Sequence, residues 1–162
     1  MGILFAFNRK LGTSLVSLWC TVAYRLAEVY PQCREAITAK LKDERFELNT
    51  ATSTEIFRQL VFGPLQTLAK STSAQRFPVV VIGALDECGG LNDRRSDRRD
   101  LLFQISEWPK LPPEFKLIVT SRDEHDIQQA FTRIPHQGLP IHTGNFVQEQ
   151  STRDIQLLLR RI

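Results

Sequence analysis

The pattern of apolar and polar positions predicts an α/β protein in which short strands alternate with longer amphipathic helices. Largely apolar runs at 3–7, 79–82 and 115–120 indicate strands, and a fourth short strand is expected at 139–142. Residues 79–82 are four consecutive β-branched residues. Such a run is typical of a strand buried on both faces in a parallel sheet.

Between these runs the apolar residues recur at helical spacing. Helices are predicted at 14–30, at 32–41 after Pro31, and from Thr52 onward, where Thr52 and Glu55 have capping-box spacing. Gly63-Pro64 should kink or split that third helix. Shorter helices are expected at 101–108, 126–131 and 151–162, and the charged stretch 91–100 is expected to be a solvated loop. The order of elements predicts a doubly wound parallel sheet with right-handed crossovers.

Composition restricts the class of protein further. The 162 residues fit one domain, and 42% hydrophobic with 24% charged residues excludes wholesale disorder. A net charge of +3 is too small to indicate nucleic-acid binding. The three cysteines form no CxxC pair and have no histidine at ligand spacing, which favours reduced thiols over a zinc site. With no secretory signal and no membrane-length apolar stretch, a cytoplasmic protein is expected.

Candidate chemistry lies where two of the expected strands end. Asp86 and Glu87 follow the run 79–82. Thr120 is the last residue of the run 115–120, and Ser121 and Arg122 follow it. Ligands of open α/β sheets bind just beyond the carboxyl ends of the strands. A purely structural interpretation stays open, in which Arg122 forms an ion pair with Asp86 or Glu87.

Two of these segments together resemble a known family. VVVIGALDEC (79–88) followed by KLIVTSRDEHDI (116–127) resembles the Walker B and sensor-1 segments of the NACHT group of STAND P-loop NTPases. The form most similar is the nephrocystin-like N-terminal NACHT domain of fungal NLR-like signalling proteins. Upstream, LFAFNRK (4–10) and TVAYRLAEVYPQ (21–32) also have counterparts in that family.

The resemblance implies a role for each candidate residue. Asp86 and Glu87 would be the vestigial catalytic residues of the Walker B region, and Arg122 the sensor-1 arginine that reads a γ-phosphate, with Ser121 and Thr120 beside it. The chain departs from the family in two respects. It contains no GxxGxGK[ST] phosphate loop, and Gly83 stands where the family has the metal-binding Asp.

We therefore expect residues 1–162 to form a partial NACHT-type domain, running from the second strand through sensor 1 to the following strand and helix. The resemblance implies a three-layer P-loop NTPase-like parallel sheet that is incomplete, because the central Walker A strand is absent. Such a domain should bind nucleotide weakly and not hydrolyse it on its own. ATP or GTP with Mg²⁺ would be the cofactor if a longer parent chain or a partner supplied the phosphate loop.

Three alternatives remain open from the sequence. The chain could be a non-catalytic interaction module that pairs with other NACHT or STAND domains through an open sheet edge. It could be a Mg²⁺-dependent phosphotransferase or hydrolase that uses Asp86 and Glu87. The third and least favoured is a nucleic-acid contact through Arg94, Arg95, Arg98 and Arg99. No membrane partner is expected.

Overall fold

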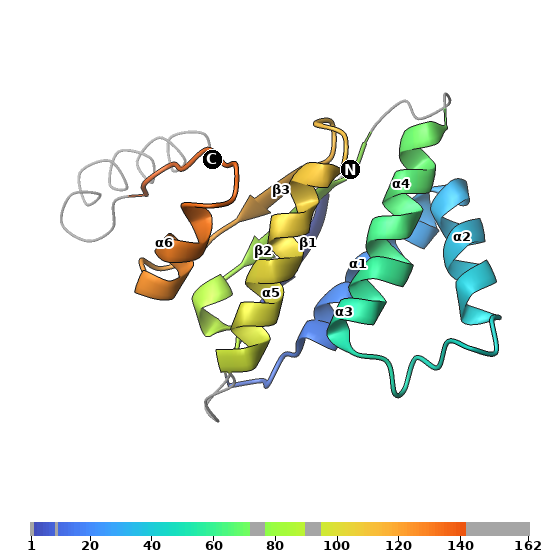
Figure 1. The fold of residues 1–162 in the computed structure, drawn as a ribbon, viewed down its shortest axis with the longest axis horizontal. Helices are drawn as coiled ribbons and strands as arrows, with labels where there is room; N and C mark the ends of the chain where they lie inside the picture. Colours follow the sequence, from blue (N-terminus) through green and yellow to red (C-terminus); the bar gives the residue numbers. More distant parts are fainter. Residues whose placement is uncertain (1, 9, 72–76, 90–94, 142–162) are drawn as a thin grey trace, which may run out of the picture.

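The computed structural model of the chain describes residues 2–8, 10–71, 77–89 and 95–141. Its sheet has three parallel strands in the order β1 (Gly2–Ala6), β2 (Val79–Gly83) and β3 (Lys116–Val119). These strands confirm the three predicted at 3–7, 79–82 and 115–120, and Figure 1 shows them behind α5. The α/β class with a parallel sheet is therefore confirmed.

The helices fall mostly where the apolar spacing predicts them. Ser14 caps the first helix by accepting a hydrogen bond from the Ser17 amide, and the capping box between Thr52 and Glu55 is formed in both directions. The helical elements are α1 (Leu15–Val29), α2 (Pro31–Leu41), α3 (Ser53–Ile56), η1 (Phe57–Phe62), α4 (Gly63–Lys70), η2 (Leu85–Glu87), α5 (Arg95–Glu107), η3 (Trp108–Lys110) and α6 (His125–Phe131).

The irregular turn expected at Gly63-Pro64 takes the form of a π-helical segment. Residues Phe57–Phe62 form this wider turn between α3 and α4, and the Gly63 amide donates to the Arg58 carbonyl five residues earlier. Proline has no amide to donate, and its ring collides with the carbonyl four residues before it in a regular helix. The wider turn relieves that collision without ending the helix.

The connections between the strands leave the sheet covered on one face. Both crossovers, from β1 to β2 and from β2 to β3, step to the adjacent strand in the same direction. Right-handed crossovers in one direction place their helices on the same side. Ile3, Val80 and Ile82 point to that side and are almost fully buried. The registered row Leu4, Val81 and Ile118 points to the other side, where Leu4 is 70% and Ile118 49% exposed.

Three expectations from the sequence are corrected by the structure. The run 79–82 is not buried on both faces among the described residues, because burial alternates along β2 and the described helices cover one face. Residues 139–141 form no strand, and Leu139 and Ile141 are highly exposed. The charged stretch is not entirely a loop, since α5 already begins at Arg95. The helix expected at 151–162 lies outside the described residues.

A buried polar network fixes α5 against the preceding helices. The Trp19 indole Nε1 donates to Gln104 Oε1 at 2.6 Å. Gln104 Nε2 in turn donates to Ser53 Oγ at 3.3 Å and to Thr54 Oγ1 at 3.2 Å. Gln104 is completely buried, so its amide depends on these partners. The network joins α1, α3 and α5, and thereby sets where α5 lies on the sheet.

Candidate functional site

The turn after β2 is held against the end of β3 by Thr120. The Thr120 amide donates to the Ile82 carbonyl at 2.9 Å, and the Thr120 carbonyl accepts from the Leu85 amide at 3.0 Å. Its hydroxyl oxygen accepts from the Ala84 amide at 3.3 Å. Ala84 has φ 53° and ψ 50°, a left-handed conformation that side-chain-bearing residues rarely adopt. This left-handed residue turns the chain from β2 into η2 and brings Asp86 next to the segment that follows β3.

Asp86 and Arg122 meet across the two strand ends, which is one form of the ion pair that the sequence left open. Asp86 Oδ1 accepts a hydrogen bond from the Arg122 amide at 3.1 Å, and Asp86 Oδ2 lies 3.6 Å from Arg122 Nε. The Asp86 side chain is 7% exposed, whereas that of Arg122 is 81% exposed. The carboxylate is therefore largely engaged in joining the two strands, while the guanidinium faces solvent.

The other predicted site residues lie on the same edge of the sheet. Glu87 is half-buried at the end of η2, and Ser121 is exposed, with its hydroxyl donating to the Arg122 carbonyl at 2.8 Å. Gly83 ends β2 directly opposite Ala6 of β1. A Cβ at Gly83 would lie only 3.2 Å from the Ala6 Cβ, so this corner has little room for a side chain.

Arg98 is part of the site but was not singled out there by the sequence. Its Nη2 donates to the Asp86 carbonyl at 2.5 Å and its Nε to the Cys88 carbonyl at 3.4 Å. Its Nη1 lies 3.2 Å from Asp126 Oδ2 and 3.9 Å from Glu124 Oε2, at the start of α6. The side chain is 16% exposed. The charge pattern of 91–100 suggested a solvated arginine, because periodicity cannot show that α5 presents this position to the turn.

Cys88 closes the turn and is buried. Burial raises the pKa of its thiol to about 12; Asp97 contributes in the same direction, and Arg98 opposes it. A thiol with so high a pKa is protonated at neutral pH and reacts slowly. Cys88 is thus a small core residue.

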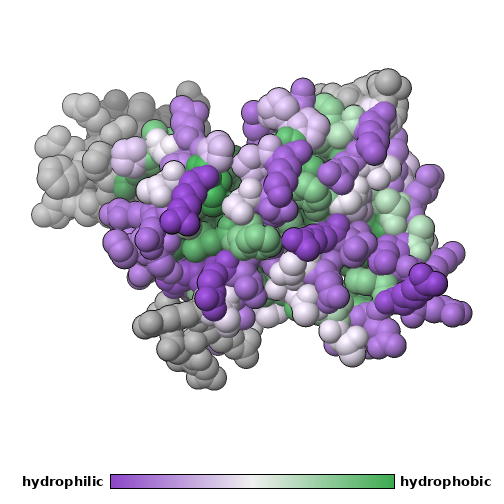
Figure 2. All heavy atoms as spheres, in the orientation of Figure 1, coloured by the Kyte–Doolittle hydropathy of each residue, from purple (hydrophilic) through white to green (hydrophobic). Residues whose placement is uncertain are grey.

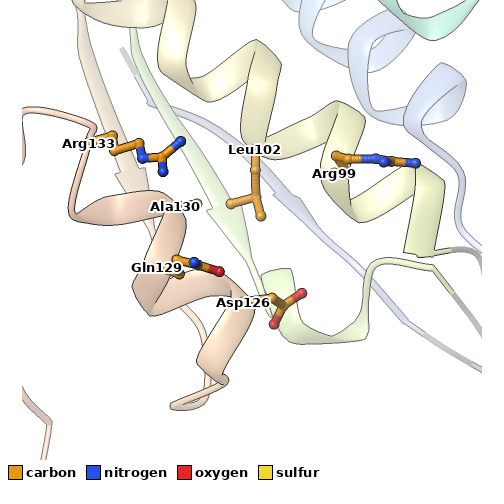
Figure 3. Close-up of a pocket in the computed structure, with 6 residues that line it drawn as sticks. All are labelled: Arg99, Leu102, Asp126, Gln129, Ala130 and Arg133. Carbon is orange, nitrogen blue, oxygen red and sulfur yellow. The ribbon is translucent and has the colours of Figure 1, made fainter.

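A groove of about 630 Å³ lies between α5 and α6, beside these residues. It is lined by Arg99, Leu102, Asp126, Gln129, Ala130 and Arg133. In Figure 3, Leu102 points from α5 toward the groove, Asp126 lies beside the turn that follows β2, and Arg99 extends along α5 away from α6. Figure 2 shows hydrophilic side chains over much of this side of the molecule, with apolar surface between them. The residues predicted for the strand ends do not line the groove, whereas Arg99, named for the nucleic-acid alternative, does.

The strand edge presents few free side-chain oxygens for a metal ion. Among the residues that the structure describes, no three His, Cys, Asp or Glu side chains are grouped so that they could hold a metal ion. Gly83 offers no side-chain oxygen, and the Asp86 carboxylate is already bound to Arg122. In the described helices, no segment is long and apolar enough to cross a membrane.

The fold and the site define an open α/β protein with polar groups gathered at the carboxyl ends of adjacent parallel strands. The chain matches the family described as Nephrocystin 3, N-terminal, over residues 2–122, and therefore belongs to this family. The resemblance to the nephrocystin-like, NACHT-type N-terminal domain is confirmed. The match includes β1, β2, η2, β3 and Arg122. The comparisons with curated proteins and with solved structures found no match.

Proposed function

We propose that these 162 residues are the Walker B and sensor-1 part of a NACHT-type nucleotide-binding domain of an NLR-like signalling protein. On their own they bind ATP or GTP weakly or not at all and do not hydrolyse it. In this proposal Asp86 and Glu87 are vestigial catalytic residues, and Arg122, with Ser121 and Thr120, is the remaining part of the phosphate-sensing edge. The chain works as part of a larger assembly, with the rest of a parent chain or with another NACHT domain.

The observation that carries the proposal is the state of the Asp86 carboxylate. It is buried, accepts the Arg122 amide and lies beside the Arg122 guanidinium. An acidic group bound in this way joins β2 to β3 and has little capacity left for a metal ion. The membership of the nephrocystin 3 N-terminal family supports the assignment of these strands.

Weak nucleotide affinity follows from what the sequence lacks. Nucleotide binding in P-loop proteins depends on backbone amides of the phosphate loop, its lysine and its Mg²⁺-binding hydroxyl. The 162 residues contain no such loop, and Gly83 provides no oxygen for the metal. Both the ground-state contacts and the stabilisation of the developing charge are then missing.

Isothermal titration calorimetry tests this proposal with the 162-residue chain, MgATP and MgGTP. We expect no saturable binding below about 1 mM, which corresponds to less than about 4 kcal/mol of binding free energy. Micromolar affinity, together with turnover that Glu87→Gln abolishes, would contradict the proposal. Tight binding of Mg²⁺ or Mn²⁺ without nucleotide would instead favour the metal-dependent hydrolase.

A second candidate function rests on the outer edge of β3. Within the described residues β3 is paired only with β2, and Ile118 on it is half-exposed. An edge strand with free backbone groups can pair with a strand from another chain. Sedimentation over a hundredfold range of concentration distinguishes the two: a monomer at all concentrations, with no heteromeric complex on mixing with another NACHT domain, contradicts this candidate.

A further inference from the structure

We propose that Arg98 is a positioning residue that couples helix α6 to the acidic turn η2. This inference rests on the proposed function only where it treats Asp86 and Glu87 as vestigial catalytic residues. The coupling itself depends on contacts that involve no nucleotide. In this proposal the contact between Arg98 and Asp126 restrains the turn, so that a movement of α6 changes the presentation of Asp86 and Glu87.

Arg98 is attached to both elements at once. From α5 it reaches two carbonyls of the turn, those of Asp86 at 2.5 Å and Cys88 at 3.4 Å. Its Nη1 contacts both carboxylate oxygens of Asp126, at 3.3 and 3.2 Å, in the first turn of α6. One planar guanidinium with several fixed donors can hold all of these acceptors, which an ammonium group cannot match.

The contacts at the turn are the stronger ones. The Arg98 side chain is 16% exposed, so water competes poorly for the carbonyls that it binds. Asp126 and Glu124 are 55% and 47% exposed, so their attraction to Arg98 is partly screened. Loss of Arg98 should therefore disturb the turn more than loss of Asp126 does.

Asp126 connects this contact to the groove. The same side chain that binds Arg98 also lines the groove between α5 and α6, and Figure 3 shows it beside the turn after β2. A displacement of α6 that draws Asp126 away removes one of the partners of Arg98. The acidic turn then loses its tie to α6 while its hydrogen bonds to Thr120 remain.

Cys88 gives a direct measure of this opening. Cys88 is 3% exposed in the turn that Arg98 holds. Cys33 is completely buried in α2, remote from the site in sequence, and its thiol lies 3.6 Å from the Pro64 carbonyl. In a Cys20→Ser background, labelling of the two thiols by a small disulfide reagent can be followed separately by mass spectrometry. Opening of the turn exposes Cys88 alone, whereas global unfolding exposes both.

We expect Arg98→Met to accelerate labelling of Cys88 by about tenfold or more, with Cys33 changed less than about twofold. Asp126→Asn should accelerate Cys88 by about threefold. Glu28→Gln, a matched control that breaks the exposed Arg25–Glu28 pair on α1, should leave both rates unchanged. Because the Arg98 charge lowers the pKa of Cys88, removal of that charge alone would slow labelling. An acceleration therefore reports opening.

Hydrogen exchange provides a second measurement. If Arg98 only stabilised the whole fold, its loss would accelerate exchange throughout the protein and not selectively at the turn. The Arg122 amide, which donates to Asp86 Oδ1, should exchange faster in Arg98→Met than the amides of α1. Equal acceleration of Cys33 and Cys88, or an unchanged Cys88, would overturn the proposal. If Arg98→Met does not fold, Asp126→Asn decides: selective acceleration of Cys88 supports the coupling, and its absence refutes it. Nucleotide binding, tested separately, has no effect on these results.

Discussion

The Asp86 carboxylate and the Arg122 amide are joined at 3.1 Å across 36 residues of sequence. This hydrogen bond connects the segment after β2 to the segment after β3, beyond the last pair of strand residues. The accompanying ion pair at 3.6 Å involves a guanidinium that is 81% exposed. The contact with the amide should therefore contribute most of the stabilisation, because exposed ion pairs contribute little.

Asp86→Ala should lower the free energy of unfolding by about 1–3 kcal/mol, because the Arg122 amide loses a charged acceptor at a largely buried position. Arg122→Met, which keeps the amide, should cost less than about 1 kcal/mol. Urea denaturation followed by circular dichroism measures both. Equal losses in the two variants would show that the ion pair, and not the amide, supplies the stabilisation.

Ala84→Gly should stabilise the protein by about 0.5–1 kcal/mol. Ala84 has φ 53°, where a Cβ is unfavourable, and glycine relieves this cost at the expense of some chain entropy. Gly12→Ala is the matched reverse change, since Gly12 has φ 61° and open space around its Cβ position. It should destabilise by a similar amount in thermal denaturation. A stabilising Gly12→Ala would contradict the strain argument.

Gly83 and Ala6 should be energetically coupled. A Cβ at Gly83 would lie 3.2 Å from the Ala6 Cβ, which is closer than ordinary van der Waals contact. Gly83→Ala should therefore be about 0.5–1 kcal/mol more favourable in an Ala6→Gly background than in the wild type. A double-mutant cycle in urea measures this difference. Simple additivity would mean that β1 moves aside without cost.

Gln104→Leu should destabilise by about 1–3 kcal/mol, because the buried Trp19 indole N–H loses its acceptor. Trp19→Phe combined with Gln104→Leu should recover part of this loss, since no donor is then left unpaired. Calorimetric melting of the three variants tests the expectation. If the double variant is less stable than the sum of the single changes, the cost does not come from the unpaired indole.

Alkaline pH should destabilise the fold through its buried cysteines. Burial raises the pKa of Cys33 to about 11 and that of Cys88 to about 12, from an ordinary value of 9.0. Above pH 9 the unfolded thiols lose protons that the folded protein retains, so stability falls as pH rises toward 11. Each thiol contributes up to roughly 1.4 kcal/mol per pH unit. Urea denaturation at pH 8 and 10 should show a shallower fall in Cys88→Ala, and equal falls would contradict this assignment.

The strands and most helices could be predicted because local signals specify them. Ser14, Pro31 and the pair Thr52 and Glu55 mark helix starts through their own hydrogen-bonding chemistry. The juxtaposition of Asp86 and Arg122 was also predictable, because carboxyl ends of parallel strands share one edge. For these features, residue type and position in the sequence were sufficient for the prediction.

What the sequence did not predict depends on tertiary packing. In the part of the chain that the structure describes, β2 is buried on one face because both crossovers run in the same direction, which the run 79–82 does not encode. The absence of a strand at 139–141 reflects pairing, since an apolar run becomes a strand only beside another one. Arg98 lay within a charged stretch and could be assigned to the turn only after the position of α5 was known.

The described helices leave the row of Leu4, Val81 and Ile118 uncovered, so a partner that binds this row can shift the folding equilibrium. A surface that packs on this row and meets only the native state adds stability that grows with the logarithm of its concentration. The melting temperature of the isolated chain is then a lower limit for the same residues in a setting where that side of the sheet is covered.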